Sequence, residues 1–237
     1  MVPPPAEPRL SGCAYNRGVD AEIPDAVARF RAGYRANEIP AGYRPALHLA
    51  FTFGGGALAL AACLLALEDV RPLEWLTVPF AFLYANLSEY LGHRYPMHRP
   101  FRGLALVYKR HAGQHHRYFT ESAMPLSDLR DLRAVLFPPL LVLFFFGLFG
   151  TPVWLALRAL ASPNVAWLFL ATAIAYFLNY ELLHLSHHLP TRVLSRLPLL
   201  ARLSRLHRIH HDPARMAHVN FNITYPIGDW LFRTRAR

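Results

Sequence analysis

Histidine is the residue type with the clearest chemical potential in this 237-residue chain. Eleven of the thirteen histidines fall into four groups, which contain no cysteine. The groups are His93 and His98; His111, His115 and His116; His184, His187 and His188; and His207, His210 and His211. Neutral imidazole binds Fe, Zn, Cu and Ni, whereas iron–sulfur clusters and thiolate zinc sites need cysteine. Because eleven ligands exceed what one ion accepts, the sequence predicts two metal ions.

The spacing within the groups is typical of ligands on helices, because residues three or four apart share a helix face. His184 and His188 are therefore predicted to point at one metal, with His187 beside them. The last group repeats this pattern.

The first two groups depart from simple helical spacing. His111 and His115 share a face, whereas His116 lies about 140° round an α-helix. It either reaches a second metal or marks the end of the helix. The two histidines of the first group are five residues apart and bracket Pro96, which predicts a kink there.

Carboxylates near the groups are candidates for holding the ligands in place. Glu89 lies four residues before His93, and Glu181 lies three before His184. Ligating imidazoles usually donate their other N–H to a carboxylate or carbonyl. The alternative is that both glutamates cap helix ends that face water. Outside the groups, His48 is interpreted as structural, and His218 is either structural or a neighbour of the site.

The elements that position these groups are predicted from four apolar stretches, each close to the roughly 20 residues that span a membrane. They cover residues 46–67, 73–91, 134–157 and 165–183. Buried core helices are the alternative interpretation. The predicted fold class is all-α: an integral membrane protein with four transmembrane helices and a cytoplasmic histidine-rich helical domain.

The distribution of charge supports this arrangement and predicts its orientation in the membrane. Four spans would place 23 of the 25 Lys and Arg residues on one side, and only Arg71 and Arg158 on the other. The positive-inside rule makes the cationic face, with both termini and all four groups, cytoplasmic. No nucleic-acid-binding motif accompanies the net charge of +10, so nucleic acid is rejected as a partner.

The predicted organisation is a cytoplasmic leader, 1–45, followed by one membrane-embedded domain, 46–237. Within the leader, 24–36 predicts an amphipathic surface helix. Residues 191–206 alternate Arg with Leu, which predicts a helix in the membrane interface or one packed on the cytoplasmic domain. Arginine outnumbers lysine 24 to one, which is typical of a GC-rich bacterial genome. The expected location is therefore a bacterial inner membrane.

In order and flanking residues, the groups resemble the histidine boxes of the fatty acid hydroxylase superfamily, which includes sterol desaturases and C4-sterol methyl oxidases. The matching segments are EYLGHRYPMH at 89–98, HAGQHH at 111–116, NYELLHLSHH at 179–188, and HRIHH followed by NFNITYPIGDWLF within 207–232. The resemblance covers roughly residues 75–234. It implies two iron ions, O2 as co-substrate, and hydroxylation of a C–H bond in a fatty acyl or sterol-like lipid.

The resemblance also suggests roles for single residues. Family members use about ten histidine ligands; by that pattern His184 and His188 carry over, and His187 is the expected spare. Asn220 and Asp229 match family positions that support the ligands or pack the tail. Arg233 departs from the pattern, since the family usually has glycine there. Without an appended cytochrome b5-like domain, a separate electron donor is expected, either a ferredoxin or a cytochrome b5-like protein.

Other activities stay open at this point. A membrane acyl desaturase would share the HX2HH spacing of the third group, but its first two groups would be further apart than His98 and His111. A carotenoid hydroxylase matches the last two groups less well. A metal transporter would need polar ligands within the spans, and a structural metal protein is the remaining non-enzyme alternative.

Overall fold

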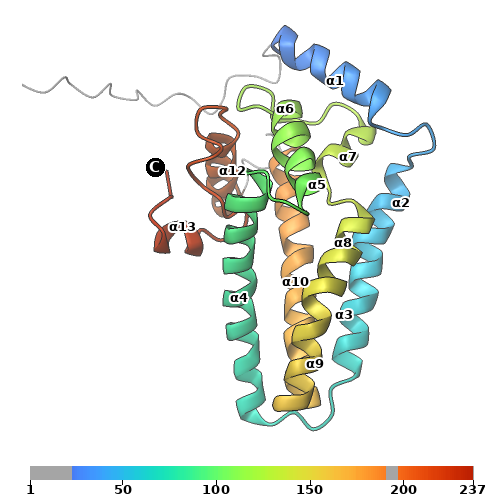
Figure 1. Cartoon of the computed structure of the whole chain (residues 1–237), viewed down its shortest axis with the longest axis vertical. Helices are drawn as coiled ribbons and strands as arrows, with labels where there is room; N and C mark the ends of the chain where they lie inside the picture. The colour runs from blue at the N-terminus through green and yellow to red at the C-terminus, as the bar shows by residue number, and fades with distance from the viewer. Residues whose placement is uncertain (1–22, 191–196, 237) are drawn as a thin grey trace, which may run out of the picture.

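The computed structural model describes residues 23–190 and 197–236, and this part of the chain is helical. Within it, the only bridge of β type is an isolated pair, Thr120 and Ala123. Long helices run side by side as an elongated bundle, and short helices gather at one end (Figure 1). The predicted all-α fold class is confirmed for the described residues.

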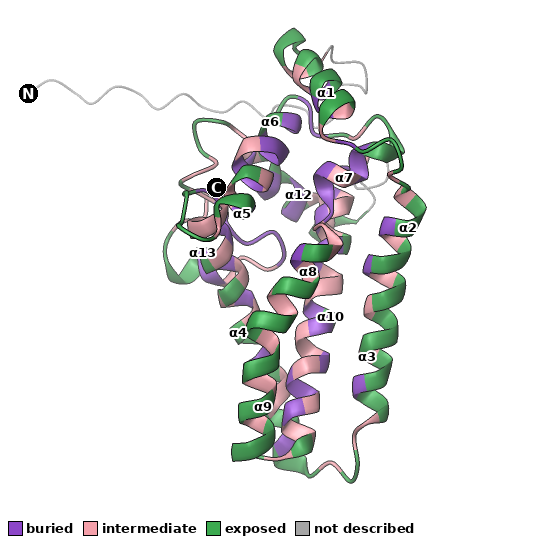
Figure 2. Ribbon diagram, turned by 45° about the vertical axis from the view of Figure 1, so that its right-hand side comes forward, coloured by how far each residue is buried: buried purple, intermediate pink, exposed green. Residues whose placement is uncertain are grey.

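Three long helical segments form one part of the bundle. They are α2 (Pro45–Leu49) with η1 (Ala50–Gly55) and α3 (Gly56–Leu65); α8 (Pro139–Phe145) with η6 (Phe146–Gly150) and α9 (Thr151–Leu160); and α10 (Pro163–His187). By length and composition, Pro45–Leu65, Leu129–Leu160 and Pro163–His187 could each cross a membrane. These segments correspond to three of the four predicted spans. The outer faces of α3 and α9 are exposed, as lipid-facing surfaces would be, while α10 is central and more buried (Figure 2).

The remaining predicted span corresponds to α4 (Thr77–Gly92), which follows η2 (Pro72–Leu76). This 16-residue helix is not among the segments that qualify as spans, so the count of four is not confirmed. At 16 residues it is short, and its polar residues Asn86 and Glu89 lower its hydropathy. The Asn86 amide donates to the Tyr176 hydroxyl at 2.8 Å, which fastens α4 along α10 (Figure 1).

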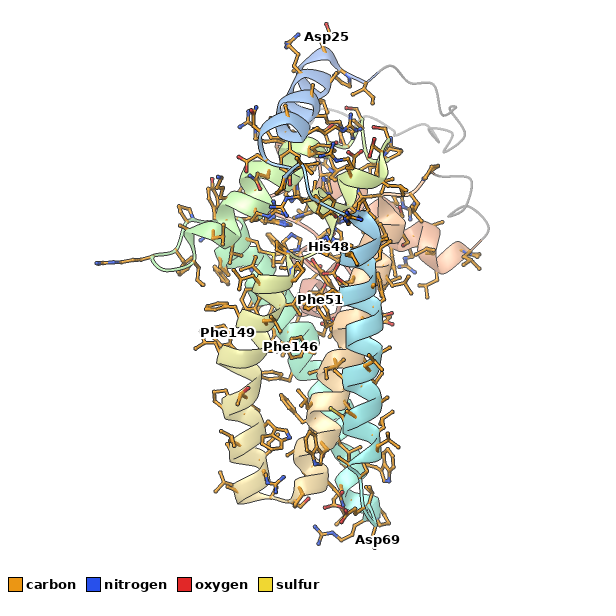
Figure 3. All side chains as sticks on the ribbon, turned by 90° about the vertical axis from the view of Figure 1, so that its right-hand side faces the viewer. Asp25, His48, Phe51, Asp69, Phe146 and Phe149 are labelled. Atoms are coloured by element: carbon orange, nitrogen blue, oxygen red, sulfur yellow. The ribbon has the colours of Figure 1, made fainter. Side chains whose placement is uncertain are left out.

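Local signals explain where the long helices begin. Proline occupies the first turn of α2, α8 and α10, where its missing N–H breaks no helical hydrogen bond. The Ser162 hydroxyl caps α10 by accepting from the Val165 N–H at 3.2 Å, and it donates to Glu74 at 2.5 Å. This contact ties α10 to η2 at the end of the bundle near Asp69, far from Asp25 (Figure 3).

The opposite end of the bundle holds the histidines and the shorter helices. They are α1 (Asp25–Asn37), η3 (His93–Met97), α5 (Ala105–Tyr108), η4 (Lys109–His115), α6 (His116–Tyr118), η5 (Leu129–Asp131), α7 (Leu132–Val135), α12 (Pro198–His210) and α13 (Ile227–Leu231). The predicted helix 24–36 is present as α1, but it packs on this region through buried Arg31 and Tyr34. Two predicted segments lie partly outside the described residues: the leader at 1–22 and the Arg–Leu helix at 191–196. The rest of the Arg–Leu helix forms the start of α12.

Candidate metal centre

The four histidine groups meet inside the helical end and form two buried clusters. Cluster one contains His93, His98, His111, His116 and His210; cluster two contains His115, His188, His207 and His211. Within each cluster, one ring nitrogen per residue lies within 4.8 Å of all the others. The His184 Nε2 lies 3.2 Å from the His115 Nε2, so we count His184 as a fifth member of cluster two. Each cluster thus draws on several helices far apart in sequence.

A π-turn brings the first histidine group together. His93 and His98 lie five residues apart along η3, which has the i→i+5 hydrogen bonds of a π-helix and contains Pro96. The wider turn returns the fifth residue to the same side, and the two ring centroids are 5.1 Å apart. The kink predicted at this proline is therefore a turn that aligns two ligands.

A second π-turn, η4, changes the expected pairing of the next group. His111 and His116 have their Nε2 atoms 3.0 Å apart and belong to cluster one, whereas His115 faces cluster two. The shared face predicted for His111 and His115 assumed α-helical rotation per residue, whereas the π-turn groups His111 with His116. His210 likewise separates from its neighbours His207 and His211.

Backbone carbonyls accept hydrogen bonds from the Nδ1 atoms of five of the candidate ligands. The pairs are His93 with Phe221, His115 with Ala134, His188 with Met124, His210 with Val219, and His211 with Phe119. A neutral imidazole that donates from Nδ1 carries its lone pair on Nε2. These five rings therefore turn lone pairs toward the clusters.

The contact between His115 and His211 shows that cluster two suits a cation. Both Nδ1 atoms donate to carbonyls, yet the two Nε2 atoms are 3.2 Å apart. Two lone pairs cannot hydrogen-bond to each other. The approach of these two neutral rings is therefore favourable only when both lone pairs face one cation. Ligand nitrogens on neighbouring sides of an ion with bonds of about 2.1 Å would be about 3 Å apart. The separation fits this geometry.

Burial also keeps the imidazoles in their metal-binding form. It lowers the pKa of His98 to about 2, with further lowering from the neighbouring charge of His210. Burial lowers the pKa values of His115 and His210 to about 4. All three rings are neutral near pH 7, and neutral imidazole is the form that binds metal.

Asp229 and Asn220 shape the loop that supplies carbonyls to cluster one. The Asp229 carboxylate accepts the backbone N–H groups of Phe221 at 2.9 Å and Asn222 at 2.8 Å. Asn220 has a φ of 54°, a conformation that asparagine tolerates, and its amide donates to the Leu206 carbonyl at 3.0 Å. Both residues act on the ligands through the backbone.

The two glutamates are close to the histidines in sequence but have other partners. Glu89 accepts the backbone N–H of Thr224 at 3.1 Å and its hydroxyl at 2.6 Å, so it anchors the same loop. Glu181 is buried and accepts the Phe137 N–H at 3.2 Å, while its second oxygen has no partner among the described residues. Neither carboxylate hydrogen-bonds to a described histidine, and neither is a cap exposed to water.

Arg31 in α1 has a matching role at cluster two, which sequence reasoning missed. Its guanidinium, 2% exposed, donates to the carbonyls of Tyr118 at 2.9 Å and Ala123 at 2.5 Å. The same loop provides the Phe119 and Met124 carbonyls that hold two ligands of this cluster. An arginine in an amphipathic segment gives no sequence signal for such a role.

Three other histidines lie outside both clusters. The His187 Nε2 is 3.4 Å from the Ile223 carbonyl. His48 hydrogen-bonds to the Tyr43 hydroxyl and to the Phe137 carbonyl, each at 2.9 Å. His218 is exposed.

A small cavity of about 40 Å³ lies on the membrane side of the site. His111, His115 and His184 all line it, so it borders both clusters. Its other walls are mainly apolar and include Leu136 and Leu141. A space of this size is sufficient for small molecules such as O2 or a few waters.

A helical bundle with membrane-length helices and two buried five-histidine clusters defines a membrane protein with a candidate dinuclear metal site. The family model described as fatty acid hydroxylase matches residues 78–234, about two thirds of the chain. The chain belongs to the fatty acid hydroxylase family, whose members are generally lipid-oxidising oxidoreductases. No curated protein and no solved structure matches it. The matched range contains every histidine of the two clusters.

Proposed function

We propose that this protein binds two iron ions and uses O2 to hydroxylate a C–H bond of a membrane lipid. The observation that carries the proposal is the close approach of His115 and His211, with both lone pairs turned toward one point beside a cavity that both clusters share. Membership of the fatty acid hydroxylase family supports the reaction class.

The chain's own residues hold and isolate the metals. Ten histidines are available as ligands, five to each cluster. When bound, the two iron ions supply the electron transfer to O2 and the oxidising power for an unactivated C–H bond. One oxygen atom of O2 is inserted into the C–H bond. The other is reduced to water, which consumes two electrons and two protons. Burial of the clusters excludes bulk water from this step.

A lipid substrate and a membrane location form part of the proposal. Three apolar segments support integration into a membrane, and we assign α4 as the fourth span because it runs parallel to α10 (Figure 1). The cationic end, which carries the clusters, would face the cytoplasm of a bacterial cell. A substrate in the inner membrane would then reach the cavity from the hydrocarbon side.

The electrons would come from a separate carrier, a ferredoxin or a cytochrome b5-like protein. The proposed cytoplasmic face contains 23 of the 25 cationic residues, and such a surface favours encounter with an acidic protein.

Product analysis tests the proposed reaction. The iron-loaded protein in lipid vesicles is given a reductant, a carrier and isotopically labelled O2, and the extracted lipids are measured by mass spectrometry. We expect one labelled oxygen atom in a lipid product, and none with the His188→Ala variant. Loss of two hydrogens without added oxygen would identify a desaturase instead, and unchanged lipids with two bound irons would refute an oxygenase.

A further inference from the structure

The membrane part of the bundle contains a second and larger cavity. This apolar groove, about 630 Å³ in volume, lies between η1–α3, α8–α9 and α10. Its volume is within the range of about 300–1,000 Å³ that is typical of ligand sites. Phe51 on η1 and Phe146 on η6 line it from facing helices (Figure 3). Trp154 and Trp167 line it near the end of the bundle away from the histidines.

We infer that this groove binds one acyl chain of the lipid substrate, with the tail toward the two tryptophans and the reacting carbon at the small histidine cavity. The inference rests on the proposed function and adds the substrate's position. It commits to an unbranched hydrocarbon chain, since the groove is lined almost entirely by apolar side chains within the bundle's membrane-length helices.

The groove and the histidine cavity are neighbours along two helices. Leu141 lines the cavity and Val142, the next residue of α8, lines the groove. On α10, Tyr180 lines the cavity and Phe177, one turn earlier, lines the groove. The rings of Phe137 and Tyr180, with centroids 5.8 Å apart, both line the histidine cavity. A chain in the groove would need to pass only this short stretch of both helices to reach the histidine cavity.

The length of the groove limits how much chain can extend beyond the reacting carbon. Trp154 and Trp167 form its floor, with ring centroids 4.9 Å apart. Trp167 precedes His184 by 17 residues on the continuous helix α10, a separation of roughly 25 Å at the α-helical rise. This distance suits a long-chain fatty acyl group.

Glycines provide substitutions that fill the groove without disturbing its walls. Gly55 and Gly147 both line it, and a Cβ added at either would meet no atom within 4 Å. Gly54 is a matched control, because its added Cβ also meets nothing, yet it does not line the groove. Leucine at the first two positions should obstruct the acyl chain, whereas Gly54→Leu should not.

Tryptophan fluorescence measures occupancy directly. With Trp75→Phe and Trp230→Phe removing the other two, the emission comes from Trp154 and Trp167. Dibromostearate, which has its bromine atoms in mid-chain, is titrated into the metal-free protein in detergent. We expect saturable quenching in this parent and with Gly54→Leu, and at least tenfold weaker apparent affinity with Gly55→Leu or Gly147→Leu. Equal affinity in all four proteins, or competition by cholesterol but not by stearate, would overturn the inference.

Two readouts separate this inference from the proposed reaction. Because quenching needs neither metal nor O2, glycine-dependent quenching without any oxidised lipid would leave the groove assignment standing and refute the reaction. Full product yield from both Gly55→Leu and Gly147→Leu would support the reaction and refute the groove assignment. Unfolding temperatures close to that of the parent would show that all the variants fold.

Discussion

At the scale of single residues, the hydrogen bond at one ring nitrogen decides what the other nitrogen can bind. Where Nδ1 donates to a backbone carbonyl, Nε2 is left as a metal ligand. Five of the histidines are fixed in this way, and they are distributed over both clusters. These hydrogen bonds mean that the backbone orients the rings of both sites before any metal binds.

The different positions of His187 and His188 predict different effects of substitution. His188→Ala should lower the metal content of the purified protein by about one ion, because it removes a ligand of cluster two. His187→Ala should retain both ions, since its nearest polar partner is the Ile223 carbonyl. Elemental analysis of metal per chain checks both. Equal losses would show that His187 is a ligand.

Acid should destabilise the metal-free protein. In the folded chain the pKa values of His115 and His210 are lowered to about 4, whereas an unfolded histidine titrates near pH 6.5. Below that value the unfolded state binds more protons, so the stability present at neutral pH is lost as the pH falls toward 4. Thermal unfolding in detergent at several pH values measures this. A constant or rising unfolding temperature on acidification would contradict it.

The sequence was sufficient to find the eleven grouped histidines but not to divide them between two sites. His111 and His116 differ by about 140° on an α-helix, yet they share cluster one because η4 is a π-turn. Such a turn depends on tertiary contacts that local spacing does not encode. The carbonyl partners were also unpredictable, since any residue can supply one.

At the scale of elements, α1 supports cluster two from outside the family match. Arg31→Met should lower the affinity of that cluster for iron about 10–100-fold, because the loop that holds two of its ligands loses its guanidinium donors. Arg29→Met, an exposed change on the same helix, is the control. Titration of metal-free protein with ferrous ion measures both. Unchanged affinity with Arg31→Met would exclude a bracing role.

The end of α13 explains the family's glycine at the position of Arg233. The Thr234 N–H bonds to the Asp229 carbonyl at 2.9 Å, and Arg233 itself has a φ of 56°. This left-handed helix cap favours glycine, and other residues are strained there by about 1 kcal/mol. Arg233→Gly should therefore raise the free energy of unfolding by about that amount, whereas Arg233→Ala should not. Chemical denaturation in detergent compares them; equal stabilities would argue against backbone strain.

At the scale of the whole molecule, the bundle and its charge predict four spans with both termini cytoplasmic. A topology reporter fused after Arg237 should indicate a cytoplasmic location. The same kind of reporter inserted at Asp69, at the far end of the bundle, should indicate a periplasmic location (Figure 3). Activity of the first fusion in the periplasm would refute this topology. Of the four stretches predicted from hydropathy, three correspond to helices of membrane length. In α4, the fourth, polar Asn86 packs against α10, a contact that a linear pattern cannot show.

The loop 219–224 has a consequence for how the protein is made. It follows every membrane helix in the chain, and its carbonyls fix His93 and His210, which come from segments more than a hundred residues apart. The ribosome therefore delivers all the apolar helices to the membrane before the loop that orients these ligands exists. On the proposed function, we expect iron loading at cluster one to be a late step of biogenesis, after insertion of the helices and after Glu89 on α4 has bound the loop.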